Sequence, residues 1–191
     1  MAEALPAGCP PPPDAEFWVF AYGSLMWNPG FPFEEARPAL LRGYHRAFCL
    51  YSHHYRGTPE KPGLVLGLDR GGSCHGIAYR IAPRHAERAM AYLWQREMDG
   101  YEYDCRDLTI AIATGTVVAR TFVVRRDKAQ YAGKLPLKRA VEIIRQGHGK
   151  NGSNRTYLEN TVRHLDQLGI PDQRLHALLV AVEQQGRDAP G

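Results

Sequence analysis

The sequence has few cysteines, and none of them form a close pair. Cys9, Cys49, Cys74 and Cys105 lie far apart and give no CxxC motif. Their spacing argues against a zinc knuckle and against a dense disulfide framework. We therefore expect reduced thiols, no bound metal and a cytoplasmic protein.

Long runs of apolar or basic residues are also missing. No apolar stretch is long enough to span a membrane. The N-terminus has Glu3 and the prolines Pro10 to Pro13 where a secretory signal needs a positive flank and an apolar core. Lys and Arg are scattered among acids, and the formal net charge is only +4. We expect no membrane partner and no nucleic-acid partner, and the sequence does not indicate an oligomeric state.

The remaining composition is typical of a globular protein. The chain has 191 residues, of which 44% are hydrophobic and 23% charged, enough to bury a substantial core in one domain. The Pro-rich arm over residues 1–15 favours an extended polyproline form, which cannot join a helix or a sheet interior. We expect a single domain over residues 16–191, and no internal repeat is visible.

Strands and helices alternate irregularly along this domain. Short apolar or alternating runs predict a strand at 17–21, another at 42–51, and two hairpins, 64–68 with 75–81 around Gly71-Gly72 and 108–112 with 116–124 around Gly115. Helical spacing, Pro and Gly signals predict helices at 83–98, 137–146, 155–168 and 172–184. Hairpins in place of regular strand-helix-strand crossovers predict an α+β fold with a mixed or closed sheet.

The first apolar run, Phe17 to Ala21, stops abruptly at Tyr22-Gly23-Ser24-Leu25. A glycine behind a buried strand allows a sharp turn with exposed backbone N–H groups. Such groups can hold a carboxylate or a developing oxyanion. An ordinary turn is the alternative interpretation.

A carboxylate continues the apolar face of the helix predicted over 83–98. Glu97 follows a stripe at spacings of three and four formed by Ala86, Ala89, Met90, Leu93 and Trp94, while other faces, expected to reach water, carry Arg84, Glu87, Arg88, Gln95 and Arg96. Burial raises the pKa of a carboxyl and suits it to general acid/base catalysis near neutral pH. The alternative is a helix-end glutamate that turns to solvent or pairs with an arginine.

Several motifs occur in an order that resembles the ChaC family of γ-glutamylcyclotransferases. The matching blocks run between about Trp18 and Val182, and they are Phe20-Ala-Tyr-Gly-Ser-Leu-Met-Trp-Asn-Pro-Gly-Phe31, Gly43-Tyr-His-Arg-Ala-Phe48, Arg56-Gly-Thr-Pro59, Gly76-Ile-Ala-Tyr-Arg80, Leu93-Trp-Gln-Arg-Glu-Met98 and Asn154-Arg-Thr-Tyr-Leu158. The resemblance implies an α+β barrel flanked by helices and cleavage of glutathione into 5-oxoproline and cysteinylglycine without a cofactor.

The same resemblance implies roles for particular residues. Tyr22, Gly23, Ser24 and Leu25 would hold the γ-glutamyl group, Glu97 would be the acid/base, and Tyr157 would line the pocket. Two segments depart from the family pattern: Glu97 to Tyr101 looks a residue shorter than in some relatives, and His148 to Gly152 is a loose match. These departures concern the rim of the pocket and the breadth of substrates.

Other functions remain open from the sequence. A Ser24 nucleophile lacks the Gly-x-Ser-x-Gly pattern, and His45, His53, His54, Cys74 and His75 lack metal-ligand spacing. A cyclotransferase for other γ-glutamyl amino acids or amines, or a non-catalytic γ-glutamyl-binding module associated with cation transport, would use the same residues. Arg56 would either contact the glycine carboxylate of glutathione or be a solvated loop arginine.

Overall fold

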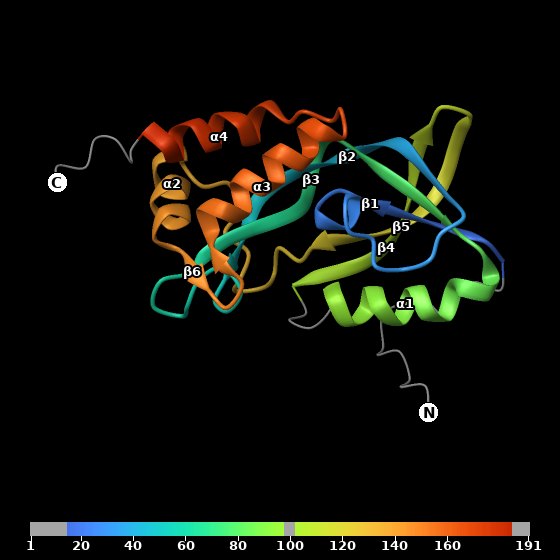
Figure 1. Cartoon of the computed structure of the whole chain (residues 1–191), viewed down its shortest axis with the longest axis horizontal. Coiled ribbons are helices and arrows are strands. Elements are labelled where there is room, and N and C mark those ends of the chain that lie inside the picture. Colours follow the sequence, from blue (N-terminus) through green and yellow to red (C-terminus); the bar gives the residue numbers. More distant parts are fainter. Residues whose placement is uncertain (1–14, 98–101, 185–191) are drawn as a thin grey trace. The chain divides into compact units, whose positions relative to one another are not determined.

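The computed structural model describes residues 15–97 and 102–184, and their secondary structure is the expected α+β mixture (Figure 1). The Pro-rich arm, Cys9 and the predicted helix stop at Asp99-Gly100 lie outside the described residues. The elements are β1 (Phe17–Ala21), a 3-10 turn η1 (Ser24–Met26), β2 (Glu35–Ser52), β3 (Gly63–Ile81), α1 (Pro83–Glu97), β4 (Tyr103–Ile112), β5 (Gly115–Val124), α2 (Leu137–Gln146), β6 (His148–Gly149), β7 (Gly152–Ser153), α3 (Asn154–Gln167) and α4 (Gln173–Gln184).

The backbone contacts divide the chain into two compact units. The first takes its described residues from Met1–Arg46 and Leu68–Arg125, and the second takes its described residues from Ala47–Gly67 and Arg126–Gly191. Each unit is described by itself below. One domain over residues 16–191 stays a prediction.

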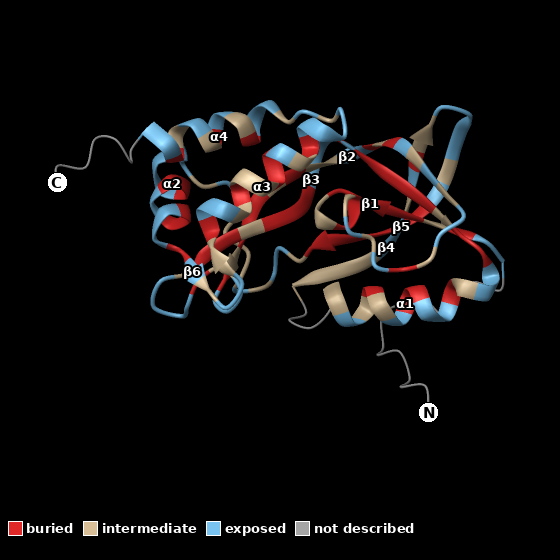
Figure 2. Cartoon of the chain, viewed as in Figure 1, coloured by how far each residue is buried: buried red, intermediate tan, exposed pale blue. Residues whose placement is uncertain are grey.

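The first unit contains a closed barrel with the strand order β1-β3-β2-β4-β5. The strand β1 pairs antiparallel with β3, where Phe17 faces Ile81, and parallel with β5, where Trp18 faces Ala119. The predicted mixed, closed sheet is therefore confirmed. Since β1 has a neighbour on both sides and is buried along most of its length, it needs the continuous apolar run that marks it in the sequence (Figure 2).

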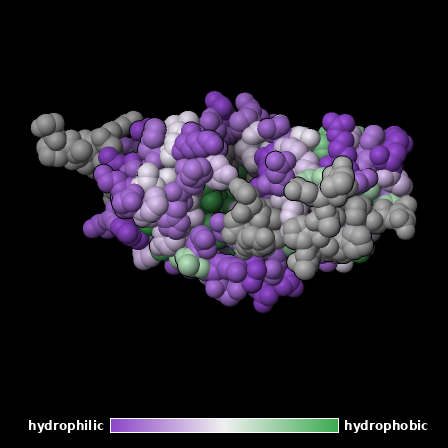
Figure 3. Space-filling view, turned by 90° about the horizontal axis from the view of Figure 1, so that it is seen from below, coloured by the Kyte–Doolittle hydropathy of each residue, from purple (hydrophilic) through white to green (hydrophobic). Residues whose placement is uncertain are grey.

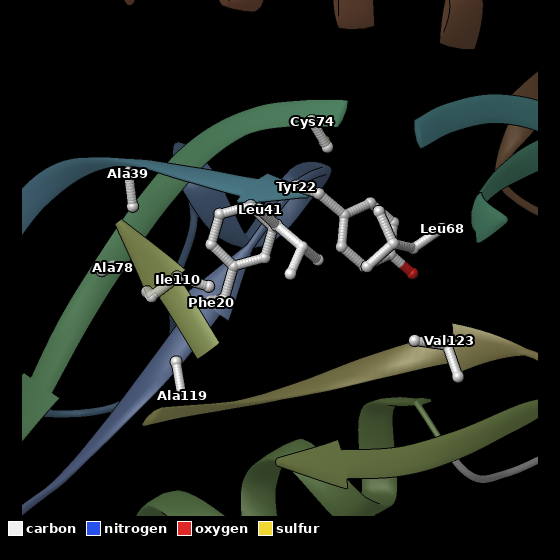
Figure 4. Close-up of a cluster of buried hydrophobic side chains, with 10 residues drawn as sticks. All are labelled: Phe20, Tyr22, Ala39, Leu41, Leu68, Cys74, Ala78, Ile110, Ala119 and Val123. Atoms are coloured by element: carbon white, nitrogen blue, oxygen red, sulfur yellow. The ribbon is translucent and has the colours of Figure 1, made fainter. Parts of the chain in front are cut away.

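Side chains from the strands fill the barrel interior (Figure 4). The cluster consists of Phe20, Tyr22, Ala39, Leu41, Leu68, Cys74, Ala78, Ile110, Ala119 and Val123. A glycine is required where β3 crosses the end of β1, because a Cβ on Gly76 would lie 2.3 Å from the carbonyl oxygen of Ala21. This close approach fixes the point at which the chain leaves β1 for the turn.

The helix α1 buries Ala86, Ala89, Met90 and Leu93 of the expected stripe, whereas Trp94 is only half-buried. Pro83 is its first residue, where a missing N–H is not needed. Figure 2 shows this stripe as red bands separated by pale-blue exposed positions. The sulfur of Met90 lies 3.5 Å from Nη1 of Arg120 on β5, so this face of α1 packs against the barrel.

One predicted hairpin is wrong and another is confirmed. The strand β3 continues through Gly71 and Gly72, whose φ angles are +101° and +73°. Two adjacent glycines in the left-handed region distort this strand locally without ending it. The hairpin of β4 and β5 forms as expected, with Gly115 at φ +135° opposite Ile112.

The second unit contains the helices α2, α3 and α4, which contact one another, and α2 has the predicted bounds. Asn154, at the start of α3, is fully buried. Its Oδ1 accepts the Leu64 N–H at 2.6 Å, and its Nδ2 donates to the Leu64 carbonyl at 2.7 Å. The amide side chain thus supplies both hydrogen bonds that a neighbouring strand would give.

Within the described residues, no helix is both long and apolar enough to cross a membrane. The face of the molecule in Figure 3 is mainly hydrophilic.

Replacement of Asn154 by alanine should destabilise the protein by roughly 2–4 kcal/mol, because two buried backbone groups of Leu64 lose their partner. Urea unfolding measures this change. Asn160→Ala, on a partly exposed part of the same helix, serves as the control and should cost less than about 0.5 kcal/mol. Equal stability of the two variants would contradict the assigned role of Asn154.

Candidate active site

The turn after β1 begins at Gly23 and forms the short 3-10 helix η1. In this turn the Met26 N–H donates to the Gly23 carbonyl at 2.9 Å. The Asn28 N–H then donates to the Ser24 carbonyl, also at 2.9 Å. The amides of Ser24 and Leu25 precede the first of these bonds. A 3-10 turn therefore follows β1 directly, and the binding of an anion by its leading N–H groups stays a prediction.

Two buried side chains from the barrel strands hold this turn. Arg46 on β2 donates through Nε to the Tyr22 carbonyl and through Nη2 to the His75 carbonyl at 2.7 Å. Tyr79 on β3 donates its hydroxyl to the Met26 carbonyl at 2.8 Å, and burial raises the pKa of this phenol to about 12. The phenol therefore stays a hydrogen-bond donor at all ordinary pH values.

Glu97 is the last residue of α1 and points toward low dielectric, as its place on the apolar stripe predicts. Its side chain is only 16% exposed. Burial raises the pKa of its carboxyl from 4.5 to about 7, and the neighbouring charge of Arg96 opposes this rise. The carboxyl can therefore both accept and donate a proton near neutral pH.

Arg96 joins the turn to the helix end. Its Nη2 donates to Ser24 Oγ at 2.7 Å, and its Nη1 donates to the Asn28 carbonyl at 3.0 Å and to the Tyr92 hydroxyl at 2.6 Å. Its Nε lies 3.4 Å from Oε1 of Glu97. One guanidinium therefore separates the carboxyl from the turn.

The expectation that Arg96 faces water is wrong, since its side chain is only 22% exposed. The chain after η1 covers this side of the helix: Gly30, at φ +72°, lies so close to Tyr92 that a Cβ would be 2.1 Å from the tyrosine hydroxyl. Helical periodicity identifies the face of a residue but not what packs over it. No role was expected for Arg46 or Tyr79, although both lie in blocks that resemble the family, Gly43–Phe48 and Gly76–Arg80.

The environment of Ser24 argues against a nucleophilic serine. Its Oγ accepts a hydrogen bond from Arg96, and a guanidinium cannot remove a proton from a hydroxyl. The hydroxyl instead anchors the turn.

The two tyrosines predicted to bind substrate lie in different units. Tyr22 is 8% exposed, and its ring belongs to the barrel core. Tyr157 lies on α3 in the second unit, where its ring is 5.6 Å from that of Phe48 and 4.8 Å from the guanidinium carbon of Arg56. Within the first unit, Tyr22, Gly23, Ser24 and Leu25 are consecutive residues at the turn, and Glu97 is linked to Ser24 through Arg96.

No cluster of three or more His, Cys, Asp or Glu side chains suited to a metal ion occurs among the residues described. Cys49, Cys74 and Cys105 form no disulfide bond.

The fold and the site now define the class of protein. A crystal structure of a γ-glutamyl cyclotransferase specific to glutathione from yeast matches with a TM-score of 0.80 and 23% sequence identity, and the match covers 89% of this chain and 96% of the yeast chain. The protein therefore has the γ-glutamylcyclotransferase fold, as expected.

Sequence comparison then gives the family. The family model for ChaC-like proteins matches residues 17–185, and the chain belongs to this family. A glutathione-specific γ-glutamylcyclotransferase of Escherichia coli is 36% identical over 174 residues, covering 91% of this chain and 75% of the relative. The γ-glutamylcyclotransferase 2-3 of Arabidopsis thaliana is 35% identical over 170 residues, covering 83% and 84%.

The raised pKa of Glu97 should make stability depend on pH. The folded state favours the protonated carboxyl, so this contribution is complete below pH 4.5 and is lost as the pH rises to about 7. Since a glutamine stays neutral, the free energy of unfolding of the wild type should fall relative to that of Glu97→Gln over this range, by at most about 3 kcal/mol. Denaturant unfolding from pH 4 to 8 measures the difference.

The matched control is Glu87→Gln on the exposed face of the same helix. Its free energy of unfolding should differ from that of the wild type by the same amount at every pH in this range. A constant difference for Glu97→Gln as well would show that Glu97 is solvated in both states.

Removal of the Arg96 charge should raise the pKa of Glu97 further, since that charge alone opposes the effect of burial. Arg96→Gln should also destabilise the protein by about 1–2 kcal/mol, because Ser24 and Asn28 lose a charged donor. A carbon-13 titration of the Glu97 carboxyl measures the first effect, with the exposed Arg88→Gln as control. An unchanged Glu97 pKa would contradict the coupling.

Proposed function

We propose that the chain is a glutathione-specific γ-glutamylcyclotransferase that releases 5-oxoproline and cysteinylglycine. The observation that carries the proposal is the carboxyl of Glu97, which has a pKa of about 7. It lies 3.4 Å from the Arg96 guanidinium, which also donates to Ser24 in the Gly23–Leu25 turn. The names of the relatives in Escherichia coli and yeast support glutathione as the substrate.

The proposed reaction is intramolecular. The α-amine of the γ-glutamyl unit attacks the γ-carbonyl carbon, and the new C–N bond closes a five-membered lactam. The old C–N amide bond then breaks, and the cysteine nitrogen leaves as an amine. The attacking nitrogen, an ammonium at neutral pH, loses two protons on becoming the lactam N–H, and the leaving nitrogen gains two on becoming the ammonium of cysteinylglycine. Glu97 carries these protons in turn, so the reaction is redox-neutral and needs no cofactor.

The pKa of Glu97 decides whether this proton transfer is feasible. The substrate α-amine has a pKa of about 8, so its ammonium form dominates at neutral pH and cannot attack. Transfer of that proton to an ordinary glutamate would cost about 5 kcal/mol, whereas transfer to a carboxyl of pKa about 7 costs about 1.4 kcal/mol. Burial of Glu97 therefore removes most of this part of the barrier.

The turn supplies the proposed anchor for the substrate. The amides of Gly23, Ser24 and Leu25 would bind the α-carboxylate and thereby hold the γ-glutamyl chain in its folded-back form; positioning of this kind can contribute roughly 7 kcal/mol or more. A backbone N–H of the same turn is proposed to stabilise the tetrahedral oxyanion. Tyr22 and Tyr157 are proposed as further substrate contacts, with the family resemblance as their support.

We also propose a cytoplasmic location. The absence of a disulfide at Cys49, Cys74 and Cys105 is consistent with a reducing compartment. We propose further that the protein does not bind nucleic acid.

Glu97→Gln should abolish 5-oxoproline release from glutathione while leaving glutathione binding intact, because the glutamine keeps the shape of the side chain but cannot move the proton. In the wild type, kcat/KM should rise with pH up to about 7 as Glu97 ionises, and it should fall above about 8 as the substrate amine loses its proton. Mass spectrometry measures the product, and calorimetry measures binding.

Glu87→Gln, on the same helix, is the control that should keep wild-type turnover. γ-Glutamyl-alanine as a second substrate separates an enzyme for glutathione from one for other γ-glutamyl amino acids. Near-normal turnover by Glu97→Gln would refute the acid/base assignment, and binding without product from the wild type would indicate a binding module.

A further inference from the structure

The guanidinium of Arg46, on β2, lies at the end of the pairing between β1 and β3 in the first unit. The last paired residues of these two strands are Ala21 and Ile77. Just beyond them, Arg46 donates through Nε to the Tyr22 carbonyl and through Nη2 to the His75 carbonyl. Arg46 is only 4% exposed. One buried guanidinium therefore bridges the two strands at the point where their backbone pairing stops.

This bridge leaves a backbone donor of the turn unused. Continuation of the β1–β3 register would place Gly23 opposite His75, but the His75 carbonyl accepts from Arg46 at 2.7 Å. Over residues 15–97 and 102–184, the Gly23 N–H finds no hydrogen-bond acceptor. Gly23 is partly exposed, whereas Tyr22 before it is buried. A ligand can therefore approach Gly23 from the side away from the barrel core.

The peptide group of Gly23 differs from the next two in the turn. The Gly23 N–H shares its peptide group with the Tyr22 carbonyl, which accepts a hydrogen bond from the cation of Arg46. The carbonyls that share a group with the N–H of Ser24 and of Leu25 accept neutral N–H groups of the following backbone. A charge-assisted bond polarises the peptide more strongly, and hydrogen bonds in a chain strengthen one another. The Gly23 N–H is therefore the strongest donor of the three.

We infer that Arg46 is a positioning residue that acts through the Tyr22–Gly23 peptide and strengthens the bond from the Gly23 N–H to the substrate α-carboxylate. The guanidinium polarises the peptide from its carbonyl side, and the carboxylate would accept from its N–H side, so both charges favour the same peptide dipole. This inference rests on the proposed function, which places the α-carboxylate at the turn. It adds the side chain that makes the turn favour a charged ligand over a neutral one.

The test compares glutathione with a derivative whose γ-glutamyl α-carboxylate is a carboxamide, which lacks only that negative charge. In the wild type, KM should be about 10- to 100-fold higher for this amide than for the acid. Arg46→Gln keeps neutral donors and should lower the preference for the acid roughly 3- to 10-fold, the difference between a charge-assisted and a neutral hydrogen bond. Arg46→Lys keeps a cation and should lie between the two.

The ratio of the two KM values separates the effect of the charge from the support of the turn, because a loosened turn raises both. Tyr79→Phe is the matched control for support, since Tyr79 holds the turn at the Met26 carbonyl without a charge. It should weaken acid and amide alike and keep the wild-type ratio. Arg42→Gln, an exposed arginine on the same strand, should change neither KM.

The inference is wrong if the wild type binds acid and amide equally, if Arg46→Gln keeps the wild-type ratio, or if its effect is confined to kcat. Urea unfolding shows whether Arg46→Gln is folded. A measurement with Arg46 intact covers the case in which it is not. In Glu97→Gln, the Gly23 amide proton should shift downfield in NMR spectra on addition of the acid, and much less with the amide. Equal shifts would overturn the inference.

Failure of this inference and failure of the proposed function give different results. Calorimetry that shows an acid preference dependent on Arg46, in a protein that releases no 5-oxoproline, would overturn the proposed function and keep the inference. Release of 5-oxoproline with a KM ratio that Arg46→Gln leaves unchanged would do the reverse. Absence of binding for both ligands would overturn both.

Discussion

The guanidinium of Arg96 is the interaction on which the site depends. Its side chain is 22% exposed, and it donates to the turn and to its own helix. The same group lies beside the Glu97 carboxyl. The position of the turn relative to the acid and the electrostatics of the acid are therefore set by one side chain.

The barrel makes this arrangement rigid. Arg46 and Tyr79 reach the turn from β2 and β3, while Arg96 reaches it from α1. Gly76 allows β3 to approach Ala21, where the turn leaves the barrel. Gly30 allows the chain after the turn to pack on Tyr92 of the helix. Held from three elements, the leading amides of the turn keep a fixed orientation, and such preorganised donors are far more effective than mobile ones.

The sequence predicted those features that local patterns determine. The run Phe17–Ala21, the helix Leu137–Gln146 and the inward position of Glu97 follow from periodicity within single elements. Prediction from the sequence failed where a segment distant along the chain determines the local structure. Gly71-Gly72 resembles a hairpin turn, but pairing with neighbouring strands continues β3 through it. Arg96 is charged and lies off the apolar stripe, yet the residues after η1 cover it, and no pattern within the helix reveals that cover.

The site also balances two opposing demands on Glu97. Burial alone would favour the neutral carboxyl so strongly that it could no longer accept a proton at neutral pH, while full pairing with a cation would hold the pKa too low. The Arg96 Nε lies 3.4 Å from the carboxylate oxygen, with its stronger hydrogen bonds directed to the turn, so its charge only partly offsets the effect of burial. A pKa of about 7 results from this division of the arginine between two tasks. We expect lower stability above neutral pH in consequence, because the folded state then holds a charged carboxyl in an unfavourable environment.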